Sequence, residues 1–137
     1  MLPDLRAYER FIYTLPQQFP VIERSTLVLI LHGPAFAELN GSLLFAQDVV
    51  LHVWEDLDFI DGVITGYSYG AFRGAERLYW YDPQPHPNTP DLALNHPHHK
   101  HVPPNIKRNR IPAPELSFHT PNLPFLITEI EQTLHFE

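Results

Sequence analysis

The sequence contains no cysteine, and this absence removes several kinds of protein at once. A chain without cysteine has no disulfide framework, no thiolate zinc site and no thiol nucleophile. Long apolar runs are missing too: Leu27 to Leu31 has five residues, against the ~20 that span a bilayer. The N-terminal residues include acids and form no apolar segment, so they do not resemble a secretory signal. We therefore expect a cytoplasmic protein that does not enter a membrane.

Basic side chains are also scarce, with nine lysines and arginines against 16 acids and a net charge of -7. Such an acidic chain is not a general binder of nucleic acid. The bases are unevenly placed, however. Residues 98–110 contain no acid and carry Lys100, Lys107, Arg108 and Arg110. A nucleic acid would therefore have to engage this one segment.

Proline and histidine, in contrast, are abundant. The chain has 15 prolines and nine histidines, and most of both lie between Asp82 and Pro124. The hydrophobic fraction of 44% is ordinary for a folded protein, and the length suits one domain over residues 1–137. The excess therefore belongs to one internal segment of a folded domain rather than to a disordered tail.

Apolar residues at helical spacing predict a helix near each end of the chain. The first helix covers residues 2–15 and ends at Pro16. The second covers residues 122–135, with Asn122 as the N-cap. Both stripes are amphipathic, so each helix is expected to cover the same apolar face of a sheet.

The residues between the first helix and Asp82 predict that sheet. Short β-type runs over residues 21–82 are separated by three turn signals, Asn40-Gly41, Asp61-Gly62 and Arg73-Gly74. Connections this short join antiparallel strands. The prediction is an α+β fold built on an antiparallel meander of about five strands.

Residues 83–121 show no periodic pattern. A loop of this length in a compact domain is usually either functional or disordered. Its prolines restrict the unfolded chain and favour a fixed path. It also contains apolar residues that could anchor it, namely Leu92, Leu94, Val102, Ile106, Ile111, Leu116 and Phe118. We predict an ordered Pro/His-rich loop that lies across the sheet and carries the functional site.

The densest group of reactive side chains is the histidine block at residues 97–101, Pro-His-His-Lys-His. If the block is extended, His99 and His101 point to one side and His98 and Lys100 to the other. Two chemistries fit this block. The alternative is that the histidines have no chemical role and are solvated or form hydrogen bonds with the loop backbone.

The first chemistry is metal-free RNA cleavage. A histidine of the block would act as general base and another as general acid, while basic side chains bind the phosphate. The second chemistry is a divalent metal site. The pair His99 and His101 would then bind the ion, with Asp82, His86 or His96 completing the ligands.

Aromatic residues lie at the end of the strand that leads into the loop. Tyr81 could stack on a nucleobase, although cross-strand packing is the more common role of strand aromatics. Asp82 precedes a proline, so it could orient a histidine or simply begin a turn. The acids Glu55, Asp56, Asp58 and Asp61 do not match a calcium-loop spacing, and we interpret them as a solvated strand end.

Three strings of the sequence resemble one family. They are LYWYDPQPHP, HPHHKHVPPNIKRNRIPAP and SFHTPNLPFLITEIE. Together they are similar to the TumE-type toxins of prokaryotic toxin–antitoxin modules, over roughly residues 20–134. The block at 97–101 is the most specific element, and Tyr69, Asp82 and His86 also resemble family positions. The leading helix and the proline-rich stretch resemble a longer subgroup.

The resemblance implies a small cytoplasmic α+β toxin encoded beside a DNA-binding antitoxin. Our leading hypothesis is a ribonuclease whose catalytic residues are His98, His99, Lys100, His101, Asp82 and His86, and whose RNA-binding residues are Tyr69, Tyr81, Lys107, Arg108 and Arg110. The alternatives are a metal-dependent nuclease built on His99 and His101, and a non-catalytic module that binds protein or nucleic acid. Group transfer ranks lower, because the sequence has no nucleotide-binding motif. We expect no required cofactor unless a divalent metal is used, and we consider a homodimer.

Overall fold

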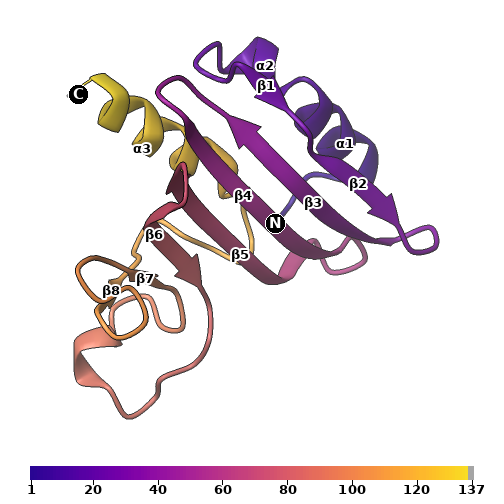
Figure 1. The fold of residues 1–137 in the computed structure, drawn as a ribbon. Helices are drawn as coiled ribbons and strands as arrows, with labels where there is room; N and C mark the ends of the chain where they lie inside the picture. The colour runs from indigo at the N-terminus through magenta and orange to yellow at the C-terminus, as the bar shows by residue number, and fades with distance from the viewer. Residues whose placement is uncertain (136–137) are drawn as a thin grey trace.

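The computed structural model describes residues 1–135 and consists of one antiparallel sheet with helices packed against it (Figure 1). The helices are α1 (Leu5–Tyr13), α2 (Leu15–Gln18), the 3-10 helix η1 (Pro90–Leu92) and α3 (Leu123–His135). The strands are β1 (Arg24–Ser25), β2 (Val28–Leu31), β3 (Phe36–Leu44), β4 (Val49–Asp58), β5 (Val63–Arg73), β6 (Glu76–Asp82), β7 (His99–His101) and β8 (Arg110–Pro112). None of the described helices is long and apolar enough to cross a membrane.

The strands lie in the order β1-β3-β4-β5-β6-β7-β8, and β2 pairs with β3 beside β1. Each neighbouring pair in this sheet is antiparallel, as the short connections predict. The prediction of about five strands was too low, because the described residues form eight. Two of the additional strands, β7 and β8, come from the segment that we expected to be a loop.

The expected turn at Asn40-Gly41 was wrong, because both residues lie inside β3. Gly41 has a φ of +138°, and a Cβ there would lie 2.5 Å from the carbonyl oxygen of Thr26. Glycine therefore lets the backbone of β3 lie close to the residues that separate β1 from β2. The chain instead reverses between β2 and β3 at Gly33, whereas the turns at Asp61-Gly62 and Gly74 form as predicted.

The N-terminal helix is shorter than expected. Asp4 caps α1 by accepting a hydrogen bond from the amide of Ala7 at 2.9 Å. The helix ends at Tyr13, and α2 begins at Leu15 with Pro16 in its first turn. A proline cannot continue the first helix, because it lacks the N–H and its ring clashes with the carbonyl one turn earlier.

The C-terminal helix buries the predicted apolar stripe against the sheet: Leu123, Leu126, Ile127, Ile130 and Leu134. Asn122 precedes the helix, and its backbone carbonyl oxygen accepts a hydrogen bond from the amide of Leu126 at 3.2 Å. Its side-chain amide bonds the backbone of Ser117 twice, at 2.9 Å each, and donates to the Tyr69 hydroxyl at 3.1 Å. Asn122 therefore fastens the preceding loop to the core.

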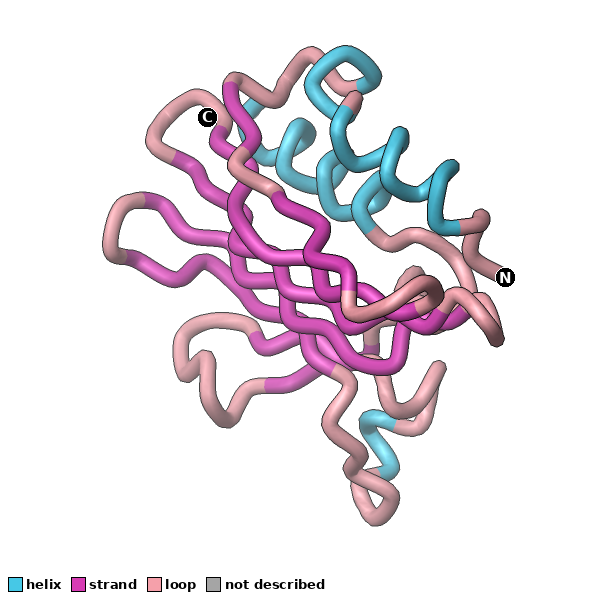
Figure 2. The backbone as a smooth tube through the Cα atoms, turned by 90° about the vertical axis from the view of Figure 1, so that its right-hand side faces the viewer, coloured by secondary structure: helices cyan, strands magenta, loops and turns pink. Residues whose placement is uncertain are grey.

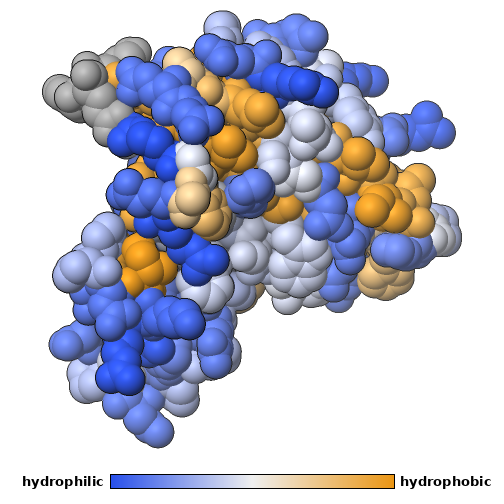
Figure 3. Space-filling view, viewed as in Figure 1, coloured by the Kyte–Doolittle hydropathy of each residue, from blue (hydrophilic) through white to orange (hydrophobic). Residues whose placement is uncertain are grey.

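Helices α1, α2 and α3 cover one face of the sheet, and among residues 1–135 no helix covers the other face (Figure 2). Side chains alternate accordingly: Leu51 and Val53 of β4 are buried on the covered face, while His52 and Trp54 point to the open face. We call this open side the helix-free face. The edge strand β2 also exposes apolar side chains, and they form an orange patch at the right of Figure 3.

The Pro/His-rich segment contains two short strands, so it is not a loop along its whole length. Strand β7 pairs with the last three residues of β6, and β8 pairs with β7, so the segment extends the sheet. Leu92 and Leu116 are buried anchors as expected, but Leu94 and Ile111 are exposed. The surface around β7 and β8 is mostly hydrophilic (Figure 3).

Candidate functional site

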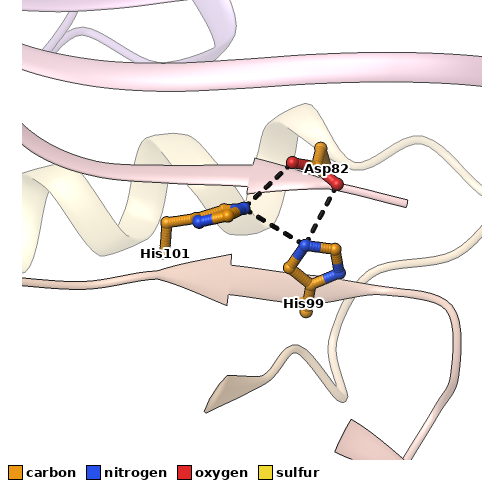
Figure 4. A group of neighbouring side chains, drawn as sticks. All are labelled: Asp82, His99 and His101. Atoms are coloured by element: carbon orange, nitrogen blue, oxygen red, sulfur yellow. Dashed lines mark hydrogen bonds and ion pairs between the residues drawn. The ribbon is translucent and has the colours of Figure 1, made fainter. Parts of the chain in front are cut away.

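The last residue of β6 faces two histidines of the neighbouring strand. Asp82 pairs in register with His99, and the Trp80 position pairs with His101. The two carboxylate oxygens of Asp82 lie 3.0 Å from His99 Nε2 and 3.0 Å from His101 Nε2 (Figure 4). The two Nε2 atoms are themselves 3.2 Å apart. We call these three residues the Asp–His–His cluster.

The cluster is buried, with relative exposures of 8% for Asp82, 1% for His99 and 4% for His101. Each imidazole is also held from its other nitrogen. His99 Nδ1 lies 3.1 Å from the carbonyl oxygen of Pro97, and His101 Nδ1 lies 2.8 Å from that of Ile106. The backbone thus fixes both rings with Nε2 directed at the carboxylate.

Burial opposes the ionised form of Asp82, but three neighbours outweigh it: the two imidazoles and the amide of Gln84, which donates to the carboxylate at 2.8 Å. These contacts hold the pKa of Asp82 below its ordinary value. The cluster therefore keeps a negative charge next to two ring nitrogens. Among residues 1–135 it also forms a group of three metal-type ligands, whose candidate atoms all lie within 4.8 Å of one another.

Strand alternation places the cluster on the helix-free face. Trp80 and Asp82 point to this face, while Tyr79 and Tyr81 point to the core. The indole of Trp80 stacks on His101, with ring centroids 4.3 Å apart. Trp80 was not among the predicted site residues, although its i, i+2 spacing from Asp82 is the signal that could have identified it.

His86 and Arg110 flank the cluster. The His86 ring contacts the edge of His99, with centroids 5.0 Å apart, and its backbone amide donates to His96. Desolvation first, then the charge of Arg110, lower the pKa of His86. Arg110 is exposed in β8, directly opposite His101. His96 itself is not part of the cluster.

His98 lies on the opposite side of the strand, as the alternation predicts. Its Nδ1 is 2.6 Å from the Tyr67 hydroxyl, and its ring stacks on Tyr67 and packs on Phe118. Burial, followed by the nearby His99 and His96, lowers the pKa of His98 to about 4. His98 is therefore a neutral packing residue near pH 7 rather than a member of the cluster.

Lys100 also points away from the cluster. Its ammonium group lies 3.0 Å from Glu129 of α3 and 4.3 Å from the centre of the Tyr79 ring. The hydroxyl of Tyr81 donates to the same carboxylate at 2.9 Å. Lys100 and Tyr81 thus join β6 and β7 to α3, and the structure does not bring them to the site predicted for them.

Tyr69 is fully buried, so the structure does not place its ring where it could stack on a base, the role that the sequence predicted. Its hydroxyl donates to Glu55 at 2.5 Å, and Tyr8 donates to the other oxygen of the same carboxylate. Glu55 is likewise fully buried, so the interpretation of this acid as part of a solvated strand end was also wrong. The sequence could not reveal the partners of the Glu55 carboxyl group, because Tyr8 lies on α1 and Tyr69 lies on β5.

The two other basic residues of the predicted site lie in the turn between β7 and β8. Lys107 and Arg108 are exposed there, and Lys107 lines an open hollow of about 600 Å³ with Arg77 and Ile106. Arg77 also lines a second hollow of about 290 Å³ on the helix-free face, together with Trp54, Phe72 and Trp80. The sequence prediction omitted Arg77, which the pairing of β6 with β5 and with β7 brings to both hollows.

Comparison with known proteins places the chain in a family. A family model described as "Toxin TumE" matches residues 13–134, which include the sheet, the cluster and nearly all of α3. The chain belongs to the TumE toxin family. No curated protein and no solved structure shows significant similarity to it. TumE membership makes the chain a relative of toxins from toxin–antitoxin modules, which act with an antitoxin partner.

Proposed function

We propose that this TumE-family chain is the toxin of its module and cleaves RNA, with the Asp–His–His cluster as its catalytic centre. The observation that carries the proposal is the convergence of Asp82, His99 and His101 within about 3 Å in a buried site on the helix-free face. A carboxylate that faces two imidazoles is a common arrangement for moving protons or holding a cation.

In the proposed reaction the ribose 2′-hydroxyl attacks the adjacent phosphorus. The new P–O2′ bond forms while the P–O5′ bond breaks, which leaves a cyclic phosphate on one product. The 2′-oxygen loses a proton and the departing 5′-oxygen gains one. The histidines could exchange these protons themselves, or they could hold a metal ion that favours the exchange. Both routes depend on the same three residues.

Substrate would approach along the helix-free face. Arg110 lies opposite His101 at the edge of the cluster, and Arg77 and Lys107 share the adjoining hollow. These side chains are suited to phosphates. The rings of Trp54, Phe72 and Trp80 line the second hollow, where they could stack on bases in place of the buried Tyr69 and Tyr81.

The partner proposed for this toxin is a DNA-binding antitoxin, as is usual for such modules. The acidic chain, with its net charge of -7, suits a basic partner. We also keep the prediction of a homodimer and of a cytoplasmic location. Size-exclusion chromatography with light scattering of the free protein tests the homodimer directly.

A non-catalytic binding module is the second candidate. The burial of His99 and His101 favours it, because a cluster that only holds β6 against β7 would have the same geometry and burial. The two candidates differ in what the cluster does to RNA. If the cluster is structural, substitutions in it lower only the stability of the protein. If it is catalytic, they lower the rate of RNA cleavage by protein that is still folded.

The test is cleavage of single-stranded RNA by wild type, His99→Gln and Asp82→Asn, all purified by one protocol. We expect each substitution to lower the cleavage rate by about 100-fold or more, since acid–base groups contribute at least that much. Circular dichroism confirms that each variant is folded. Equal cleavage by all three proteins, or none by wild type, would leave the binding module as the better account.

A further inference from the structure

We infer that the Asp–His–His cluster binds one divalent transition-metal ion of the zinc type. The inference concerns the same residues as the proposed function, but it rests on their hydrogen bonding and spacing and not on any reaction. It would stand even if the protein did not cleave RNA.

The first argument is the direction of the hydrogen bonds. Backbone carbonyl oxygens only accept, so His99 Nδ1 and His101 Nδ1 must carry the protons that they share with Pro97 and Ile106. In a neutral imidazole the other nitrogen then has a lone pair and no proton. Both Nε2 lone pairs therefore point at each other and at a carboxylate, which is also an acceptor.

Such a group of acceptors requires a positive charge between them. One extra proton would satisfy one nitrogen and leave the lone pair of the other facing a carboxylate oxygen at 3.0 Å. Two extra protons would place two imidazolium rings with their Nε2 atoms 3.2 Å apart in a buried site. Like charges at this distance repel strongly where water is excluded. One metal ion satisfies both lone pairs and the carboxylate together. An Nδ1–H bond to a backbone carbonyl is also the usual support of a metal-bound histidine.

The spacing of the two ring nitrogens and the two carboxylate oxygens fits that ion. Zinc–nitrogen and zinc–oxygen bonds of about 2.0–2.1 Å set neighbouring ligand atoms roughly 3.0–3.4 Å apart in octahedral or tetrahedral geometry. The two Nε2 atoms lie 3.2 Å apart, and each lies 3.0 Å from a different oxygen of the Asp82 carboxylate. The ligands are thus already at the distances that coordination needs. The carbonyls of Pro97 and Ile106 and the ring of Trp80 hold them there.

The donor set selects the class of metal. Two imidazoles and one carboxylate suit zinc, iron, cobalt or nickel, whereas magnesium and calcium prefer oxygen ligands. Three protein ligands also leave at least one position for water or substrate, which is typical of catalytic rather than structural sites. In the proposed nuclease such an ion would polarise a phosphate oxygen.

The experiment is isothermal titration of the full chain, freed of metal with a chelator and dialysed. We expect zinc to bind wild type at one ion per chain, and magnesium to give no binding heat. Asp82→Asn and His99→Ala should weaken zinc binding by about 100-fold or more. The matched control is His98→Gln, which removes the neighbouring histidine without touching the cluster and should leave the affinity unchanged.

Cobalt(II) provides a second readout, because its visible absorption reports coordination by nitrogen ligands. The bands should appear with wild type and His98→Gln and disappear with His99→Ala. Absence of zinc binding by wild type, or equal binding by Asp82→Asn, would overturn the inference. Zinc binding without RNA cleavage would instead reject the proposed function, while full cleavage by protein that binds no zinc would reject only the metal site. Asp82→Asn keeps the shape of the side chain, so it serves if the alanine variant does not fold.

Discussion

Trp80 lies flat against His101, with ring centroids 4.3 Å apart and an interplanar angle of 17°. The indole nitrogen donates to the hydroxyl of Ser68 at 3.0 Å, which fixes the ring from the next strand. His101 is thereby confined between an aromatic face and the carbonyl of Ile106. The stack holds the ring of His101 in place, so we expect Trp80 to report metal binding at the cluster.

Tryptophan fluorescence should therefore follow metal binding. The chain has two tryptophans, so Trp54→Phe leaves Trp80 as the sole indole and Trp80→Phe leaves Trp54. We expect zinc to change the emission of the Trp54→Phe protein, because the charge of the ion reaches the indole through the stacked imidazole. A titration at fixed protein concentration measures the change.

Trp80→Phe is the matched control, since Trp54 lines the hollow but does not stack on the cluster. Its emission should stay constant over the same zinc range. Zinc affinity should fall by about 10-fold in Trp80→Leu, because Trp80 holds the ring of a proposed ligand, and it should recover in Trp80→Phe. An equal response of both tryptophans would contradict the assignment of the ion to this cluster.

The two adjacent histidines should behave differently in RNA cleavage. His99→Gln is expected to lower kcat/KM by about 100-fold or more, because it removes a cluster nitrogen. His98→Gln should keep the rate within about threefold, since His98 packs against Tyr67 and Phe118 on the other side of the strand. It should instead lower the free energy of unfolding. A loss of cleavage in both folded variants would show that the whole block acts as one site.

Lys100 should contribute to stability and not to cleavage. Lys100→Met removes the contact with Glu129 and the position over Tyr79, and leaves a half-buried carboxylate. We expect the free energy of unfolding to fall by about 1–2 kcal/mol. Urea unfolding measures it, with the exposed Lys107→Met as control, expected within about 0.5 kcal/mol of wild type. A stable Lys100→Met protein that no longer cleaves RNA would restore Lys100 to the site.

Glu55 should make stability depend on pH. Burial raises the pKa of this carboxyl, although hydrogen bonds from Tyr69 and Tyr8 oppose the shift. The folded protein therefore keeps the proton to a higher pH than the unfolded chain, whose value is near 4.5. The contribution of Glu55 to the free energy of unfolding is largest at acid pH. It falls as pH rises from that value through the raised pKa.

Glu55→Gln removes this titration, since the amide stays neutral. The free energy of unfolding of the variant relative to wild type should thus increase as pH rises above 4.5, measured by urea unfolding at several pH values. Asp56→Asn, one residue along and exposed, is the control. A constant difference between Glu55→Gln and wild type at all pH values would mean that the buried carboxyl does not titrate differently on folding.

Local patterns predict the outline of this fold, but not its long-range pairings. The apolar stripe of α3 and the turns at Asp61-Gly62 and Gly74 follow from spacing and turn chemistry. The prediction of a turn at Asn40-Gly41 was wrong because glycine is needed not only in turns but also where two backbone segments lie very close together. Strands β7 and β8 have only three residues each, too few to show an alternating pattern.

The candidate site was predicted in part. Asp82, His99 and His101 were all named from the sequence, and the structure brings them together. The alternation of β7 also separates them correctly from His98 and Lys100. What a single sequence could not provide is the register of β6 against β7, or the partners of Lys100 and Tyr69. Those partners, Glu129 and Glu55, lie on elements that only the folded chain places beside them.

We propose that the Asp–His–His cluster is the catalytic centre for RNA cleavage, and we infer that it binds a metal ion. The most direct measurement is the rate of RNA cleavage by metal-stripped protein before and after addition of zinc or magnesium, for wild type and Asp82→Asn. We predict that zinc restores cleavage by wild type, that magnesium does not, and that Asp82→Asn stays inactive with either. Full cleavage by the stripped wild type would contradict the metal site, and full cleavage by folded Asp82→Asn would contradict the catalytic role of the cluster.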